Sequence, residues 1–565
     1  MEVQVPWNPD QVFSDLQAAC QILSERGLKL AAKWAAEQLM GLPTPSHPQH
    51  AAFPHLKWQE ETATPHYART LMDLGEYAHA ASVLSEPPTS NSVLSVPPPS
   101  TDLSPAGFAL RAYALYMAGE AVLENNRDDK KAKNPHVQQL QLELQQAYEQ
   151  ERLDAFGLHV YGMVLKKTNA RPSDTTPQAI LMQSILQFPY NWSAWLDLAE
   201  IALQDATVEK DIDAQLGSVL GENFCFHFFC AHLQAQHQAH AEALRIYERW
   251  LDLLGGSPYV ATQAAVTQYH LRLLAPAKAL LEDLHSALPY RLDAMDVYSN
   301  ILYVQEDSVQ LAQLAHQAVQ VDPHRPETCC IVGNYYSLKQ DRAKAISYFR
   351  RALQLDPTFT SAWTLMGHEY VEWKQTAHAM EAYRRAVQVN AQDYRAWYGL
   401  GQTYELLELY FYALHYYQRA AQLRPTDARM WTAVGHAYCQ LRQLPQAIRA
   451  YERAVQQTDA EGVATHKLAF LYQETGQRDK AAQCFAQYLD NRQVDKLLEA
   501  PEAEALHYLA QYYRENGDYE EAAMLATLLL EYPGPEKEEA KALLRELRAR
   551  KNRQMVNPSV FEFSP

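Results

Sequence analysis

A period of 34 residues is the feature that most constrains how this chain of 565 residues can fold. Four copies of one pattern share a register, each with a large residue, a Gly four residues later and a Tyr three residues after that. The copies begin at Cys329, Trp363, Trp397 and Trp431, with glycines Gly333, Gly367, Gly401 and Gly435 and tyrosines Tyr336, Tyr370, Tyr404 and Tyr438. Units this short cannot bury their own apolar faces, so they must stack into one continuous superhelix.

The second half of each copy has a small residue, an aromatic residue four later and another small residue three after that. The sets are Ala345/Phe349/Ala352, Ala379/Tyr383/Ala386, Ala413/Tyr417/Ala420 and Ala447/Tyr451/Ala454. This spacing resembles the tetratricopeptide repeat (TPR), a pair of helices called A and B. Small residues at the eighth and twentieth positions let the two helices approach closely, and the aromatic residue fills the gap between them.

The same pattern continues on both sides of these four copies. Further copies begin at Met295 and Thr465, and looser ones near His227 and Ala261, which makes eight in one register. A shift of seven residues then restores the frame at Leu506. The predicted fold is therefore all-α, a superhelical TPR solenoid.

We expect four parts along the chain. They are a region of degenerate repeats at 1–203, an insertion at 204–223, the regular array at 224–532, and a capping helix with a tail at 533–565. In the first part, the Pro/Ser-rich stretch 85–105 and the charged stretch 125–135 are typical of exposed loops. In the last part, acidic residues precede basic ones, which suits the dipole of a helix.

The first part also has apolar helices where a solenoid would otherwise need a polar cap. The residues behind this observation are Trp34, Leu39, Trp192 and Trp195. They predict a homodimer formed through the region before residue 200.

Composition excludes several functional classes. The formal charge of −18 argues against nucleic-acid binding, because phosphate recognition draws on clustered Lys and Arg. The first residues lack the pattern of a signal peptide, and no stretch reaches the roughly 18 apolar residues of a membrane span. We therefore expect a soluble, intracellular protein with no membrane partner. Seven cysteines without a C-x-x-C pair indicate reduced thiols.

No motif predicts a catalytic residue, a cofactor or a metal site. Four residues that can bind a metal fall within eight positions, at Cys225, His227, Cys230 and His232. On one helix they would point in about three directions, whereas structural zinc needs ligands from two elements, so core packing is the better interpretation. Gly399-Leu400-Gly401 lacks the third glycine of a dinucleotide fingerprint, and His368-Glu369 lacks the second histidine of a zincin helix.

The concave face of a TPR array is formed by the helix A residues that do not pack, chiefly at the second, fifth, ninth and twelfth positions. The candidates on or beside these positions are Asp296, Asn300, Tyr303, Asn334, His368, Glu369, Gln402 and Glu405. Such a groove suits an extended peptide, because amide side chains can pair with its backbone and tyrosines can flank its side chains. For each residue taken alone, a solvated helix face is an equally good interpretation.

Several strings go beyond the repeat consensus. They are RGLKLAAKW, DAMDVYSNILYV, ETCCIVGNYYSL, AWTLMGHEYVE and DYRAWYGLGQTYELL. In these strings the chain resembles the cell division cycle protein 23 family, subunit eight of the anaphase-promoting complex (cyclosome), from about residue 15 to about residue 550. It departs from that family at 85–105, near 170–178 and in its short tail.

This resemblance implies a non-catalytic scaffold subunit of a ubiquitin ligase that acts in the cell cycle, in nucleus and cytoplasm. It also implies a homodimer, contacts with related TPR subunits, and a groove for the C-box segment of a coactivator. That segment contains Arg, which Asp296, Asn334, Glu369 and Glu405 would suit electrostatically.

Two alternatives remain at this stage. One is a TPR adaptor of the co-chaperone type outside this complex, whose carboxylate clamp needs Lys at the fifth and Asn at the ninth position of a repeat. In the repeat whose ninth residue is Asn334, the fifth residue is Cys330 and not Lys, which argues against a carboxylate clamp. The other is a TPR appendage of an enzyme, for which the repeats leave almost no room.

Overall fold

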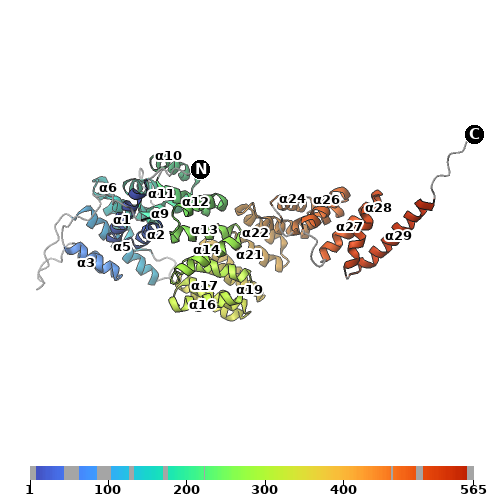
Figure 1. Ribbon diagram of the computed structural model, residues 1–565. Helices are drawn as coiled ribbons and strands as arrows, with labels where there is room; N and C mark the ends of the chain where they lie inside the picture. Colours follow the sequence, from blue (N-terminus) through green and yellow to red (C-terminus); the bar gives the residue numbers. More distant parts are fainter. Residues whose placement is uncertain are drawn as a thin grey trace, which may run out of the picture. The chain divides into compact units, whose positions relative to one another are not determined.

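The computed structural model describes residues 8–43, 63–85, 103–125, 133–168, 176–221, 223–457, 459, 462–491, 500–532 and 534–556. Within these residues every regular element is a helix, as predicted (Figure 1). Most of the stretches 85–105 and 125–135, the insert near 170–178 and the end of the tail lie outside them. The chain divides into two compact units, 1–307 and 308–565, so the division falls inside the regular array.

The first unit contains fifteen described helices. They are α1 (Pro9–Glu25), α2 (Lys29–Met40), α3 (Ala63–Asp73), α4 (Tyr77–Val83), α5 (Pro105–Asn125), α6 (Val137–Glu149), α7 (Ala155–Thr168), α8 (Pro177–Gln187), α9 (Trp192–Ala202), α10 (Ala206–Leu220), α11 (Phe224–Gln236), α12 (His240–Leu253), α13 (Pro258–His270), α14 (Leu274–Ala287) and α15 (Met295–Val304).

The second unit continues the alternation of A and B helices. Its elements are α16 (Ser308–Val321), α17 (Pro326–Leu338), α18 (Arg342–Leu355), α19 (Thr360–Glu372), α20 (Thr376–Val389), α21 (Tyr394–Leu406), α22 (Tyr410–Leu423), α23 (Ala428–Gln440), α24 (Leu444–Gln456), α25 (Val463–Glu474), α26 (Arg478–Asn491), α27 (Ala500–Asn516), α28 (Tyr519–Leu528), the 3-10 turn η2 (Leu529–Glu531) and α29 (Glu536–Val556).

One left-handed backbone position per repeat marks the turn from helix A to helix B. It recurs every 34 residues, with φ from 56° to 78°, at Gln238, Arg272, Glu306, Gln340, Lys374, Glu408, Arg442 and Gly476. These eight turns confirm the eight predicted copies. The next such turn is Gly517, which comes 41 residues after Gly476 and so includes the predicted shift of seven.

Hydrogen bonds explain why the chain turns at this position. The residue after each left-handed position donates its backbone N–H to the carbonyl of the repeat's eleventh residue. Examples are Asp341 to Tyr336 at 3.0 Å and Gln375 to Tyr370 at 2.8 Å. This bond satisfies a carbonyl that the end of helix A would otherwise leave without a partner.

In the four central repeats the eighth position is glycine, because an aromatic ring of helix B lies against it. A Cβ atom on Gly367 would lie 2.5 Å from Tyr383 Cε1, and one on Gly401 would lie 2.4 Å from Tyr417 Cδ1. Contacts between real Cβ atoms and carbon are essentially never this short. The close approach of helices A and B predicted from the sequence is therefore confirmed.

The first unit is held together differently, because α2 packs against helices far along the chain. Trp34 stacks on Trp192 of α9 with ring centroids 4.7 Å apart. Trp34 also contacts Phe224 and Phe228 of α11 and Tyr259 of α13. One apolar cluster consequently extends from α1 to α13.

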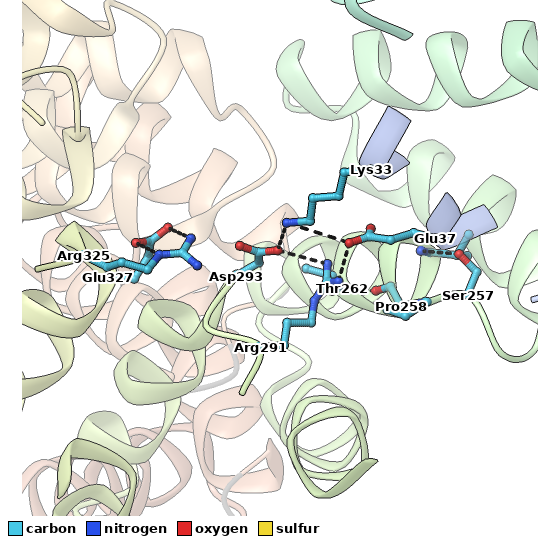
Figure 2. A network of polar contacts seen from close by, with 10 residues as sticks. Lys33, Glu37, Ser257, Pro258, Thr262, Arg291, Asp293, Arg325 and Glu327 are labelled. Carbon is cyan, nitrogen blue, oxygen red and sulfur yellow. Dashed lines mark hydrogen bonds and ion pairs between the residues drawn. The ribbon is translucent and has the colours of Figure 1, made fainter. Parts of the chain in front are cut away.

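Polar contacts also join α2 to residues much later in the chain (Figure 2). Arg291 Nη1 donates to Glu37 Oε1 at 2.6 Å, and Lys33 Nζ lies 2.6 Å from Asp293 Oδ2. Farther along α2, Ser257 Oγ donates to Gln38 Oε1 at 3.0 Å. Helix α2 is thus joined to residues more than 200 positions later in the sequence.

One expectation for the first part needs correction. Trp34, Trp192 and Trp195 are only 4%, 5% and 0% exposed, so they form the core of a single chain and offer no dimer surface. The expected insertion 204–223 contains helix α10, which packs on α8 and α9. Its buried residues Ile212 and Leu216 follow the spacing of an amphipathic helix, which the sequence interpretation missed.

Candidate peptide-binding groove

Five of the eight predicted groove residues lie in the second unit, on three successive A helices. Asn334 lies on α17, His368 and Glu369 on α19, and Gln402 and Glu405 on α21. The other three, Asp296, Asn300 and Tyr303, lie on α15 of the first unit.

Burial separates these residues into two groups. Asn334 and Glu369 are only 2% and 6% exposed, and Asp296 and Asn300 are each 7% exposed. His368 and Tyr303 are exposed, and Gln402 and Glu405 are half-buried. In the second unit, an incoming peptide would therefore meet the side chains of His368, Gln402 and Glu405 first.

Glu369 is a buried carboxylate with a neighbour on the preceding A helix. The Ser337 hydroxyl of α17 donates to Glu369 Oε1. Burial raises the pKa of Glu369, although the bond from Ser337 and the positive charge of Arg342 act in the opposite direction. Burial therefore disfavours the ionised form of Glu369, and a further cation or hydrogen-bond donor would stabilise that form.

Glu405 is held by groups from two other helices. The Tyr417 hydroxyl of α22 donates to Glu405 Oε2, and His436 Nδ1 of α23 lies 2.9 Å from Glu405 Oε1. Burial alone would raise the pKa of Glu405, but the hydrogen bonds to His436 and Tyr417 outweigh it and lower the pKa. Glu405 is thus a preoriented anion at neutral pH.

Arginines at the start of two A helices pair with an adjacent aspartate. Asp393 accepts from the backbone N–H of Arg395 and also binds its guanidinium at 3.0 Å. Asp427 does the same for Arg429, with the shortest N–O distance 2.6 Å. These aspartates cap the helices and offset the positive charge of the arginines.

A family model described as anaphase promoting complex subunit 8 / Cdc23 matches residues 11–265. Tetratricopeptide models match residues 326–359, 360–393 and 466–535. "Anaphase-promoting complex subunit 8" of Arabidopsis thaliana is 37% identical over 580 residues, which cover 95% of this chain and 96% of that protein. The chain belongs to the anaphase-promoting complex subunit 8/Cdc23 family.

Another family member is similar over part of the chain, and one solved structure shares its fold. "Cell division cycle protein 23 homolog" of Homo sapiens is 36% identical over 325 residues, which cover 55% of this chain and 50% of that protein. The crystal structure of the APC/C hetero-tetramer Cut9–Hcn1 matches with a TM-score of 0.56 at 17% identity, covering 94% of this chain and 95% of that one. This second likeness concerns the fold alone.

Two tyrosines of this chain contact candidate groove residues. From the sequence they are expected only to pack between helices. The Tyr383 hydroxyl lies 2.8 Å from His368 Nδ1, and the Tyr417 hydroxyl donates to Glu405. Each ring fills the space between helices A and B, while its hydroxyl reaches a groove residue. The sequence held a signal, because a buried tyrosine needs a hydrogen-bond partner and the equivalent residue one repeat earlier is Phe349.

The cysteines and the Cys/His cluster of α11 behave as packing residues. All seven cysteines are free thiols. Burial raises the pKa of Cys225 and Cys230 and lowers that of His232. Among the described residues, no group of three or more His, Cys, Asp or Glu side chains could hold a metal ion. In that same part of the chain, none of the helices has the length and apolarity to cross a membrane.

Proposed function

We propose that this chain is a non-catalytic TPR scaffold subunit of an anaphase-promoting complex, a ubiquitin ligase of the cell cycle, and that it works in nucleus and cytoplasm. The observation that carries the proposal is 37% identity, over 95% of this chain, to a protein named as subunit 8 of that complex. Repeats occupy nearly all of the chain, which suits a protein that binds other proteins. Co-purification of the tagged full-length protein with other subunits of the ligase tests this proposal.

The partner proposed for the groove is the Arg-containing C-box segment of a coactivator. Glu405 offers a carboxylate whose orientation is already set by Tyr417 and His436, so little ordering is needed when an arginine binds. His368 lies on the preceding A helix, α19, and Gln402 lies on α21 with Glu405, so both side chains are placed to pair with a peptide backbone. Charge-assisted hydrogen bonds of this kind are the strong ones at an interface.

The peptide proposal can be tested with one substitution that preserves shape. Glu405→Gln keeps an acceptor for the Tyr417 hydroxyl but removes the charge, so affinity for a C-box peptide should fall by ~1.5–3 kcal/mol, about ten-fold or more. Fluorescence polarisation of a labelled peptide measures the change. Glu408→Gln is the matched control, because Glu408 is an exposed carboxylate in the turn that follows the same helix. Equal affinities for the wild type and Glu405→Gln would remove Glu405 from the site.

A homodimer through the region before residue 200 also stays a proposal. It now depends on surface residues of the first unit, because the tryptophans are internal. Leu30, Met40 and Leu74 are apolar side chains of this region that are 79%, 61% and 74% exposed. Light scattering of the full-length protein at micromolar concentration distinguishes a dimer from a monomer.

A further inference from the structure

A cavity of about 370 Å³ lies among three consecutive helices of the second unit. It is lined by Arg350, Leu353 and Gln354 of α18, by Trp363, Met366 and Tyr370 of α19, and by His378, Glu381 and Ala382 of α20. Leu353, Met366 and Ala382 are buried, whereas Arg350, Gln354, His378 and Glu381 are exposed. The cavity therefore has an apolar interior and a polar rim open to solvent.

The neighbouring repeats show what is missing from this cavity. The residues 34 positions before and after Ala382 are Tyr348 and Tyr416. Tyr348 stacks on Tyr336 with ring centroids 5.5 Å apart and an interplanar angle of 16°. Tyr416 stacks on Tyr404 at 5.1 Å and 7°. Tyr370 is the equivalent of Tyr336 and Tyr404, but Ala382 gives it no ring at that place.

The rest of the arrangement is preserved around this gap. His378 stacks on Tyr370 at 5.3 Å, just as Tyr412 stacks on Tyr404 at 5.6 Å. Arg350 Nη2 donates to the Tyr370 hydroxyl at 3.3 Å, and its counterpart Arg384 donates to Tyr404 at 2.8 Å. The repeat thus keeps the surroundings of a stacked tyrosine and lacks the tyrosine itself.

We propose that this cavity is a socket for one tyrosine or phenylalanine side chain carried by a partner protein. Its volume is at the small end of ligand sites, which suits a single side chain better than a cofactor. Trp363 and Tyr370 offer aromatic surfaces, and offset or edge-to-face ring pairs add attraction beyond the burial of apolar area. Rigid aromatic anchors in such pockets dominate many protein interfaces.

The socket is separate from the groove. Trp363, Met366 and Tyr370 recur at helical spacing on one side of α19, and His368 lies about 200° around the helix from Tyr370. The inference goes beyond the proposed function and does not depend on it. A partner could occupy the socket while a peptide occupies the groove.

Ligand-observed fluorine NMR with 4-fluorophenol, a mimic of the tyrosine side chain, tests the socket in the full-length protein. Ala382→Tyr should fill the cavity as Tyr348 and Tyr416 fill theirs, and weaken 4-fluorophenol binding by about ten-fold or more. Tyr416→Ala should open an equivalent cavity beside Tyr404 and add a second binding site. Equal binding to the wild type and a folded Ala382→Tyr variant would overturn the proposal, and so would the absence of a gain in Tyr416→Ala.

A displayed library of 12-residue peptides tests whether the natural occupant is an aromatic side chain of a protein. Selection uses the full-length protein, and counter-selection uses the Ala382→Tyr variant. Enrichment of Tyr or Phe at one shared peptide position supports the proposal. Enrichment of aliphatic residues alone, or of peptides that bind Ala382→Tyr equally well, contradicts it. The affinity of Ala382→Tyr for a C-box peptide should equal that of the wild type. The socket proposal and the groove proposal can then be tested, and rejected, separately.

Discussion

The second unit, with its regular repeats, and the first unit are stabilised by different kinds of contact. From α17 to α26 the contacts run mainly between neighbours in sequence, each helix packing on the one before and the one after. In the first unit, α2 also packs on α9 and α13, which begin more than 150 residues later. A damaged repeat should therefore weaken its surroundings, whereas damage to α2 should weaken distant helices together.

Trp34→Ala should have the largest effect, because it removes a buried ring that contacts four other rings. The expected loss in the free energy of unfolding is ~3–5 kcal/mol for the first unit. Urea unfolding measures this loss, and hydrogen exchange should show faster exchange in α2, α9, α11 and α13 together. Trp373→Ala is the matched control, since Trp373 is 44% exposed and should cost less than about 0.5 kcal/mol. Faster exchange confined to α2 would contradict the comparison.

Gly367→Leu comes next and acts on the second unit. Its Cβ atom alone would collide with Tyr383, whose ring also lies where a Cβ atom on Gly399 would be placed. Overpacking of this kind costs ~1–3 kcal/mol. Faster hydrogen exchange should centre on α19, α20 and α21.

Gly255→Leu is the control for Gly367→Leu, because a Cβ atom there would meet only the Leu251 carbonyl at an ordinary 3.5 Å. An unchanged melting temperature in Gly367→Leu would mean that the repeat register is wrong. Loss of protection throughout the first unit would instead mean that the two units unfold as one.

The regular repeats could be predicted from sequence because their contacts recur with the period. Gly367 and Tyr383 meet within one repeat, and the same pair recurs at Gly401 and Tyr417. The contact between Trp34 and Trp192 does not recur with the repeat period, so no sequence pattern predicts it.

The groove was only partly predictable, since helical position gives the direction of a side chain but not how deeply neighbours cover it. Asn334 has the position expected of a ligand contact, yet it is almost fully buried. Glu405 occupies an expected position as well, but its bonds to Tyr417 and His436 come from helices that the spacing of α21 alone does not reveal.

The smallest expected effect is a difference in how two carboxylates of the same array, Glu369 and Glu405, make stability depend on pH. The folded-state pKa of Glu405 lies below its ordinary value of 4.5, so its ionisation stabilises the fold above that pH. This contribution is lost as pH falls through the lower, folded-state pKa. Burial raises the pKa of Glu369 above the same ordinary value, so its ionisation opposes folding as pH rises past 4.5.

Urea unfolding of the wild type, Glu405→Gln and Glu369→Gln between pH 3 and pH 7 separates these contributions. At pH 7 the wild type should be more stable than Glu405→Gln by less than about 1 kcal/mol, because Glu405 is partly exposed to solvent. That difference should shrink toward zero as the pH falls below 4.5. Glu369→Gln should instead gain stability relative to the wild type as the pH rises from 4.5 to 7. Parallel curves for the two variants would mean that Tyr417 and His436 do not distinguish Glu405 from Glu369, and that Glu405 is not the preoriented anion of the groove.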